Sequence, residues 1–173
     1  YENAAAFLDD LYLLRDSLIS HGDRIVAMQD LQALIRLVES FGFHLLQLDI
    51  RQESTVHTRT VTAVLRQIDP DFDYAGAAEA DRLQRLAAWI AHIDLIGVDD
   101  AALDDEAREA LAVFRRMAKL KAEVGDEVFG TYVISMTHSA SHVMEVMLLA
   151  RLVGLCGHNG RDWVCRIQVA PLF

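Results

Sequence analysis

Residues 132–169 read YVISMTHSASHVMEVMLLARLVGLCGHNGRDWVCRIQV, and this stretch decides the fold. The apolar run at 132–136 predicts a short buried strand. The next segment is apolar almost all round through Leu152, so it predicts a buried helix that ends at Gly154, with Ser139 or Ser141 as its cap. A further strand is expected at 164–169. A strand, a helix and another strand in this order favour a parallel βαβ unit.

The preceding residues predict one more strand among several helices. The apolar run at 44–50 fits a buried strand, after which Ser54 or Thr55 could cap a helix that continues to about Ile68. Apolar residues recur at helical spacing over 79–96 (Ile93 among them) and over 105–123, where Asp104 or Asp105 is the expected cap. The first forty residues predict two helices, which are separated at His21-Gly22-Asp23 and end at Gly42.

This order of elements predicts a helix-rich α/β fold. We expect one continuous piece over 1–173, with a helical segment at 1–42, a first strand at 43–54 and a βαβ unit at 127–173. The stretch 55–126 is longer than an ordinary crossover between parallel strands and predicts a large helical insertion. The chain opens without an initiator Met and stops directly after a strand-like run, so we expect a fragment of a larger protein.

Composition excludes several classes of protein. Hydrophobic residues make up 53% of the chain and charged residues 24%, which excludes a disordered chain. The net charge of −10 disfavours nucleic-acid binding, which needs a basic face. No run of about 18 uncharged apolar residues is present, so we expect no membrane span. No signal peptide is recognisable, and Cys156 and Cys165 are expected to be reduced thiols in a cytosolic protein.

The most informative candidate for a functional residue is Arg51. It directly follows a predicted buried strand, and ligands gather at the carboxyl ends of parallel strands. A guanidinium in that place needs a negative partner. The partner could be Asp49 or Glu53, forming an internal ion pair, or it could be an anionic ligand, because Arg matches carboxylate and phosphate oxygens. The residues alone leave both alternatives open.

His138, His142 and Glu145 have the spacing of a possible metal site on a helix. The first His lacks the adjacent Glu of a zinc-protease motif, so polar residues of a first helical turn are the favoured interpretation. Ser139 and Ser141 are expected to be caps and not nucleophiles. His57 and His92 have no partner that spacing identifies. The remaining candidates are expected to pack in the core: Met136, Met144, Met147, Trp89 and Trp163.

Three stretches together resemble the phosphoenolpyruvate carboxylase family. FGFHLLQLDIRQES at 41–54 is similar to that family's F-G…L-D-I-R-Q-E-S segment. YVISM at 132–136, with the Ser139-Ala140-Ser141 turn and the apolar helix after it, resembles the family's Y-[VI]-I-S-M…S-x-S-D-V segment. VAPLF at 169–173 is similar to V-x-P-L-F-E-T. His142 departs from the family's Asp, and 151–153 departs from its K-E-A, which leaves the subfamily open.

The resemblance implies a partial TIM (β/α)-barrel with a large helical insertion. It implies a parent enzyme that converts phosphoenolpyruvate and bicarbonate to oxaloacetate and phosphate with magnesium or manganese. The parent would be a cytoplasmic, allosteric homotetramer. Arg51 matches the Arg of the family motif and would bind substrate, whereas the expected metal-binding Glu would follow Phe173.

The fragment itself would therefore hold no metal or cofactor and would be inactive without the remaining parts of the same chain. Two alternatives remain. One is a non-catalytic helical interaction module, and the other is a different barrel enzyme that binds phosphoenolpyruvate.

Overall fold

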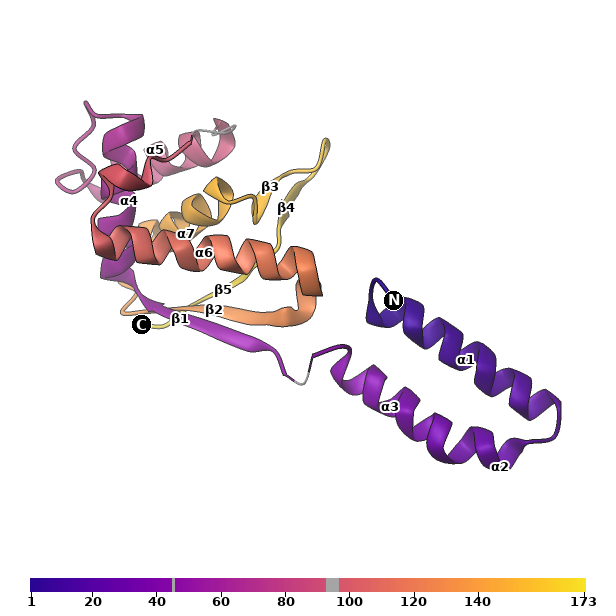
Figure 1. Ribbon diagram of the computed structural model, residues 1–173. Helices are drawn as coiled ribbons and strands as arrows, with labels where there is room; N and C mark the ends of the chain where they lie inside the picture. Colours follow the sequence, from indigo (N-terminus) through magenta and orange to yellow (C-terminus); the bar gives the residue numbers. More distant parts are fainter. Residues whose placement is uncertain (45, 93–96) are drawn as a thin grey trace. The chain divides into compact units, whose positions relative to one another are not determined.

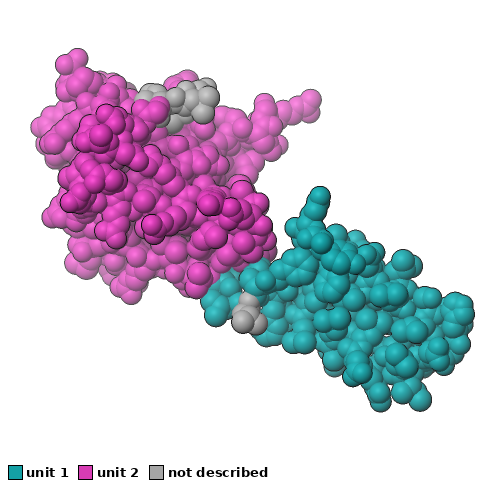
Figure 2. All heavy atoms as spheres, viewed as in Figure 1, with its two compact units in different colours: residues 1–47 teal, residues 48–173 magenta. Residues whose placement is uncertain are grey.

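The computed structural model describes residues 1–44, 46–92 and 97–173. The chain divides into two compact units, Tyr1–Gln47 and Leu48–Phe173, which Figure 2 shows in teal and magenta. Each unit is described by itself below. Among the described residues, no helix combines the length and the apolar character that a membrane span requires.

Unit 1 is built from helices, as the sequence predicts. Helix α1 (Ala4–Ser20) begins at Asn3, whose side chain accepts a hydrogen bond of 2.9 Å from the backbone N–H of Ala6. The chain turns at Gly22 and continues through α2 (Arg24–Val26) and the π-helical turn η1 (Ala27–Leu31) into α3 (Gln32–Phe41). Helix α3 ends at Gly42, where φ is +58° and a residue without Cβ is favoured. The small core of this unit centres on Leu11, Ile35 and Val38.

Unit 2 contains a three-stranded parallel sheet, which confirms the α/β class. Its strands are β1 (Leu48–Glu53), β2 (Phe129–Ser135) and β5 (Gln168–Pro171), in the order β1-β2-β5 (Figure 1). The register places Arg51 beside Val133 and Val133 beside Ala170. Within the described residues the sheet has two free edges, so it is an open sheet and not a closed barrel.

Two strand predictions need correction. The first strand begins at Leu48 and not at His44, and it is mostly exposed, because it is an edge strand with helices on one face only; Leu45 lies outside the described residues. The strand expected at 164–169 is two strands. Its first part, β4 (Trp163–Cys165), pairs antiparallel with β3 (Cys156–His158), and its second part becomes β5. The chain pairs with β3 up to Arg166, whose N–H still donates to the carbonyl of Leu155, and it pairs with β2 after that residue.

The long connection between β1 and β2 is helical, as predicted. It contains α4 (Ser54–Ile68), α5 (Glu79–His92), the 3₁₀ turns η2 (Asp100–Ala102) and η3 (Asp126–Val128), and α6 (Asp105–Val124). The predicted helix over 79–96 is described only as far as His92, so Ile93 lies outside the described residues. The predicted cap Asp104 is confirmed, because its side chain accepts from the N–H of Ala107 at 2.8 Å.

The core of unit 2 lies between the sheet and its helices. Helix α7 (Ala140–Leu152) is buried along most of its length, as its apolar sequence predicts. Phe114 of α6 stacks on Tyr132 of β2 with ring centroids 5.1 Å apart. Partly buried residues pack around this core, among them Met144, Met147, Trp89 and Trp163. The expected core position of Met136 is wrong, because this side chain is 55% exposed in the loop after β2.

The expectation of two reduced thiols is also wrong for this structure. Cys156 and Cys165 are joined by a disulfide. The hairpin of β3 and β4 places the two residues directly opposite each other. This pairing depends on a turn that the spacing of the two cysteines does not reveal.

Candidate functional site

The sheet of unit 2 has one face covered by helices and one face turned away from them. Ile50 and Val169 pack against the core together with Tyr132 and Ile134, which are buried. Because successive side chains of a strand point to opposite faces, Arg51 lies on the other face of the sheet. The side chain predicted from the sequence as the main candidate is therefore held on the helix-free face, near the carboxyl end of β1.

Arg51 is exposed and makes no hydrogen bond or ion pair with the residues that the structure describes. The two carboxylates considered as its partners are engaged elsewhere. Asp49 accepts a hydrogen bond of 2.7 Å from the N–H of Thr131, and Glu53 accepts one of 2.8 Å from the hydroxyl of Thr55. The internal ion pair that the sequence left open is absent from the described structure. The guanidinium is thus available to an anion.

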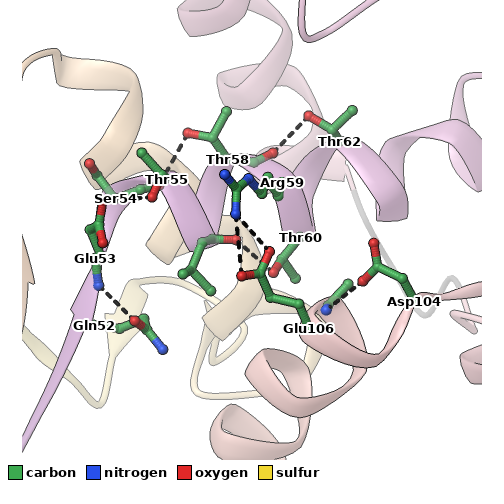
Figure 3. Close-up of polar contacts among 12 residues, drawn as sticks. Gln52, Glu53, Ser54, Thr55, Thr58, Arg59, Thr60, Thr62, Asp104 and Glu106 are labelled. Atoms are coloured by element: carbon green, nitrogen blue, oxygen red, sulfur yellow. Dashed lines mark hydrogen bonds and ion pairs between the residues drawn. The ribbon is translucent and has the colours of Figure 1, made fainter.

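The junction of β1 and α4 is attached to the loop that follows β2. The hydroxyl of Ser54 donates to the carbonyl of Met136 at 2.6 Å, so Ser54 does not cap its own helix as predicted. Met136 has φ of +57°, a left-handed conformation that a residue with a side chain rarely adopts. Thr55 also donates outside the helix, to Glu53 (Figure 3). These contacts fix the carboxyl ends of β1 and β2 next to each other.

A hollow of about 490 Å³ lies at this end of the two strands. Arg59 of α4 lines it and forms an ion pair of 3.3 Å with Glu106 of α6, which Figure 3 shows across the two helices. The other residues that line the hollow come from both strand ends and the helices after them: Glu53, Ser54, Thr55, Thr58, Arg82, Met136, His138 and His142. The hollow places polar and cationic groups where ligands gather in parallel sheets.

The three residues with metal-site spacing do not form a metal site in the described part of the chain. The Nδ1 atom of His142 accepts a hydrogen bond of 3.3 Å from the backbone N–H of His138. Glu145 is fully buried and accepts from Tyr74 at 2.7 Å and from Thr58 at 2.9 Å. Across residues 1–44, 46–92 and 97–173, no three His, Cys, Asp or Glu side chains gather as metal ligands would.

The N-terminus of α7 is capped by a residue that the sequence did not identify. Ser139 occupies the cap position, but its side chain makes no capping bond to the helix backbone. The carboxylate of Glu79, on α5, instead accepts from the backbone N–H and the hydroxyl of Ser141, each at 2.8 Å. A carboxylate at this end of a helix also interacts favourably with the helix dipole. A cap contributed by another helix leaves no local signal in the sequence.

Two buried titratable groups lie in this region. Burial raises the pKa of the Glu145 carboxyl to about 7, although hydrogen bonds from Tyr74 and Thr58 act in the opposite direction. His57 is fully buried, and its Nε2 atom shares a hydrogen bond of 2.8 Å with the Tyr132 hydroxyl. Burial, and after it the charge of His142, lowers the pKa of His57 to about 4. His92, in contrast, is exposed in the last turn of α5.

These two groups predict opposing effects of pH on stability. Glu145 stabilises the folded state below pH 4.5, and this contribution is lost as pH rises through 7. His57 contributes stability above pH 6.5 that is lost as pH falls through 4. In a Glu145→Gln variant only the second effect remains. As pH rises from low to neutral, the free energy of unfolding of this variant should therefore increase by about 2 kcal/mol relative to that of the unmodified chain.

The measurement is urea denaturation of both proteins from about pH 4 to about pH 8. Glu109→Gln is the matched control, because Glu109 is exposed on α6, and its curve should run parallel to that of the unmodified chain. Parallel curves for Glu145→Gln as well would show that Glu145 does not titrate as inferred.

The comparisons with known proteins agree on one family over the entire chain. The family model described as phosphoenolpyruvate carboxylase matches residues 1–173. The chain is similar to proteins named phosphoenolpyruvate carboxylase from Azorhizobium caulinodans (37% identity over 173 residues), Paraburkholderia xenovorans (34% over 177) and Rhodothermus marinus (35% over 180). These alignments cover 99–100% of this chain but only 18–19% of each relative.

Proposed function

Because this chain belongs to the phosphoenolpyruvate carboxylase family, we propose that it is part of an enzyme that carboxylates phosphoenolpyruvate with bicarbonate, giving oxaloacetate and phosphate. The chain spans less than a fifth of the length of its curated relatives, so this activity belongs to the longer protein. The family match favours this interpretation over an interaction module or a different barrel enzyme.

We propose that β1, β2 and β5 are three strands of an eight-stranded TIM barrel. Three observations support this proposal: the strands are parallel, their order in the sheet follows their order in the chain, and within the described residues helices pack on one face of the sheet only. In such a barrel the helix-free face would turn toward the barrel interior, and the carboxyl ends of the strands would form the site. Residues 55–126 would then be a helical insertion between the first two of these strands.

The observation that carries the proposal is that Arg51, on the helix-free face, has no hydrogen-bond or ion-pair partner among the described residues. We assign it to binding the phosphoenolpyruvate anion. In the proposed reaction, a bicarbonate oxygen attacks phosphorus, and the bond from phosphorus to the enol oxygen breaks. The products of this step are carboxyphosphate and an enolate. The Arg51 guanidinium would stabilise the negative charge that collects on the phosphoryl and enolate oxygens. Carbon dioxide released from carboxyphosphate then carboxylates the enolate.

We propose that the complete enzyme uses magnesium or manganese, as the family assignment suggests. The described residues do not fit such a site, because no three potential ligands among them come together. The metal ligands would therefore come from other parts of the protein. The family assignment is likewise the basis for proposing a cytoplasmic homotetramer with allosteric control.

The direct test is an assay of the complete gene product with phosphoenolpyruvate, bicarbonate and magnesium. Oxaloacetate is measured through its reduction by malate dehydrogenase and NADH. We expect oxaloacetate formation that depends on all three components. A complete, folded product without this activity would overturn the proposed function.

The 173-residue chain alone should be inactive in the same assay. It supplies Arg51 but no metal site among its described residues, and separated catalytic groups cannot supply a positioned active site. The complete enzyme at the same molar concentration is the positive control. Oxaloacetate formation by the purified chain would show that the site is complete without the remaining parts.

A further inference from the structure

The disulfide-bonded cysteines occupy a particular position in the β3–β4 hairpin. The N–H of Arg166 donates to the carbonyl of Leu155 at 2.8 Å, and the N–H of Asn159 donates to the carbonyl of Asp162 at 3.0 Å. Hydrogen-bonded and non-hydrogen-bonded pairs alternate along an antiparallel ladder. The Cys156–Cys165 pair is therefore a non-hydrogen-bonded pair, in which opposite residues approach most closely. Their Cα atoms are 4.1 Å apart.

The two cysteines differ in their access to solvent. Cys156 is 3% exposed, whereas Cys165 is exposed on the outer strand of the hairpin. A hollow of about 350 Å³ lies against Cys156 and is bordered by Arg151 and Arg166. Because Cys165 is exposed, its sulfur can meet a small thiol or disulfide from solution, whereas the buried Cys156 is positioned to resolve the product.

Two guanidinium groups border the hairpin. Arg151 rests against Gly157, where a Cβ atom would come within 3.0 Å of its Nη1 atom, so the glycine leaves room for this cation beside the hairpin. Arg166 directly follows Cys165 and forms an ion pair with Asp126 at 2.6 Å. The thiolate is the reactive form in disulfide exchange.

We propose that Cys156 and Cys165 form a reversible thiol–disulfide site that reacts with small disulfides of the glutathione type. The thiolate of Cys165 attacks one sulfur of the oxidised glutathione, and one glutathione thiolate leaves. The thiolate of Cys156 then attacks the Cys165 sulfur, and the second glutathione leaves. The two cysteines lose two electrons to the oxidant and release two protons. In the reverse direction, one thiolate of a dithiol reductant attacks the Cys165 sulfur and Cys156 leaves as a thiolate. The second thiol of the reductant then releases Cys165, so the reductant becomes a disulfide and the two cysteines gain two electrons and two protons. In a reducing compartment, such a pair has the character of a redox sensor.

The hairpin transmits this change to the sheet. Only Arg166 and Ile167 separate Cys165 from β5. Leu172 directly follows β5. Its N–H donates to the carbonyl of Ile134, and the carbonyl of Leu172 accepts from the N–H of Thr137. The disulfide restricts the chain before β5, so oxidation should stabilise β5 against local opening.

The test equilibrates the purified 173-residue chain in glutathione buffers of graded ratio and counts free thiols by maleimide labelling and mass spectrometry. Both thiols should disappear together within one chain. The oxidised chain should melt about 5 °C higher than the reduced chain. The Arg166 and Leu172 amides should exchange hydrogen more slowly after oxidation, while exchange in α4 stays unchanged.

Cys165→Ser is the matched variant, because it removes the exposed partner and leaves the buried one in place. Its melting temperature should equal that of the reduced unmodified chain and should not change with the glutathione ratio. If this variant does not fold, the thiol count of the unmodified chain is sufficient to test the proposal. Thiols that titrate independently, persistent glutathione adducts, disulfide-linked dimers or an unchanged melting temperature would overturn the proposal.

Discussion

Replacing Arg51 by glutamine in the complete enzyme should lower kcat/KM for phosphoenolpyruvate by about 10²- to 10³-fold. Glutamine keeps a polar side chain but removes the charge that would stabilise the phosphoryl and enolate oxygens. Arg51 is exposed and makes no hydrogen bond or ion pair with described residues, so its loss should leave the folded structure intact. Steady-state kinetics and thermal melting of the same preparation separate a loss of activity from a loss of stability.

Two further variants sharpen this test. Arg51→Lys keeps the charge but loses the planar fork, so its kcat/KM should lie between that of the Arg51→Gln variant and that of the unmodified enzyme. Arg66→Gln makes the same change of residue type on the exposed side of α4 and should leave kcat/KM unchanged. Full activity of Arg51→Gln in a folded enzyme would remove Arg51 from the proposed site.

Replacing Phe114 by alanine should destabilise unit 2 by about 3–5 kcal/mol. Phe114 is 1% exposed, and its ring contacts the ring of Tyr132 and the edge of His57. Alanine would leave a cavity between α6 and the sheet, and it would remove an aromatic contact as well as buried apolar area. The effect should be the largest of any substitution considered for this unit.

Urea denaturation followed by tryptophan fluorescence measures this loss, because Trp89 and Trp163 both lie in unit 2 and report on it alone. Leu120→Ala is the control on the same helix. Leu120 is 38% exposed, so its truncation should cost well under half as much. Equal midpoints for Phe114→Ala and the unmodified chain would show that α6 does not pack on β2 as the structure has it.

The sequence predicted the type and order of most elements because these depend on short-range signals. Apolar residues at helical spacing revealed α5 and α6, and Asp104 revealed the start of α6. The apolar run at 132–136 revealed β2. Three stretches together, of which the motif around Arg51 is the most specific, suggested the family that the comparisons then showed.

The same signals failed where a residue's partner is distant in the chain. Ser54 has a local capping role available, yet its hydroxyl bonds to Met136, 82 residues away. Glu79 caps a helix that begins 61 positions later, and Glu145 joins Thr58 to Tyr74. The strand expected at 164–169 divides because its two halves meet different neighbours.

The amino-acid sequence by itself determined that helices and parallel strands alternate, and it determined the motif that carries Arg51. Only the tertiary structure decided that Arg51 stands on the helix-free face without an acidic partner among the described residues, and that Cys156 meets Cys165. The physical reason is the distance along the chain over which each interaction acts. Periodicity and capping act within a few residues along the chain, whereas the pairing of buried or charged groups follows from which surfaces pack together.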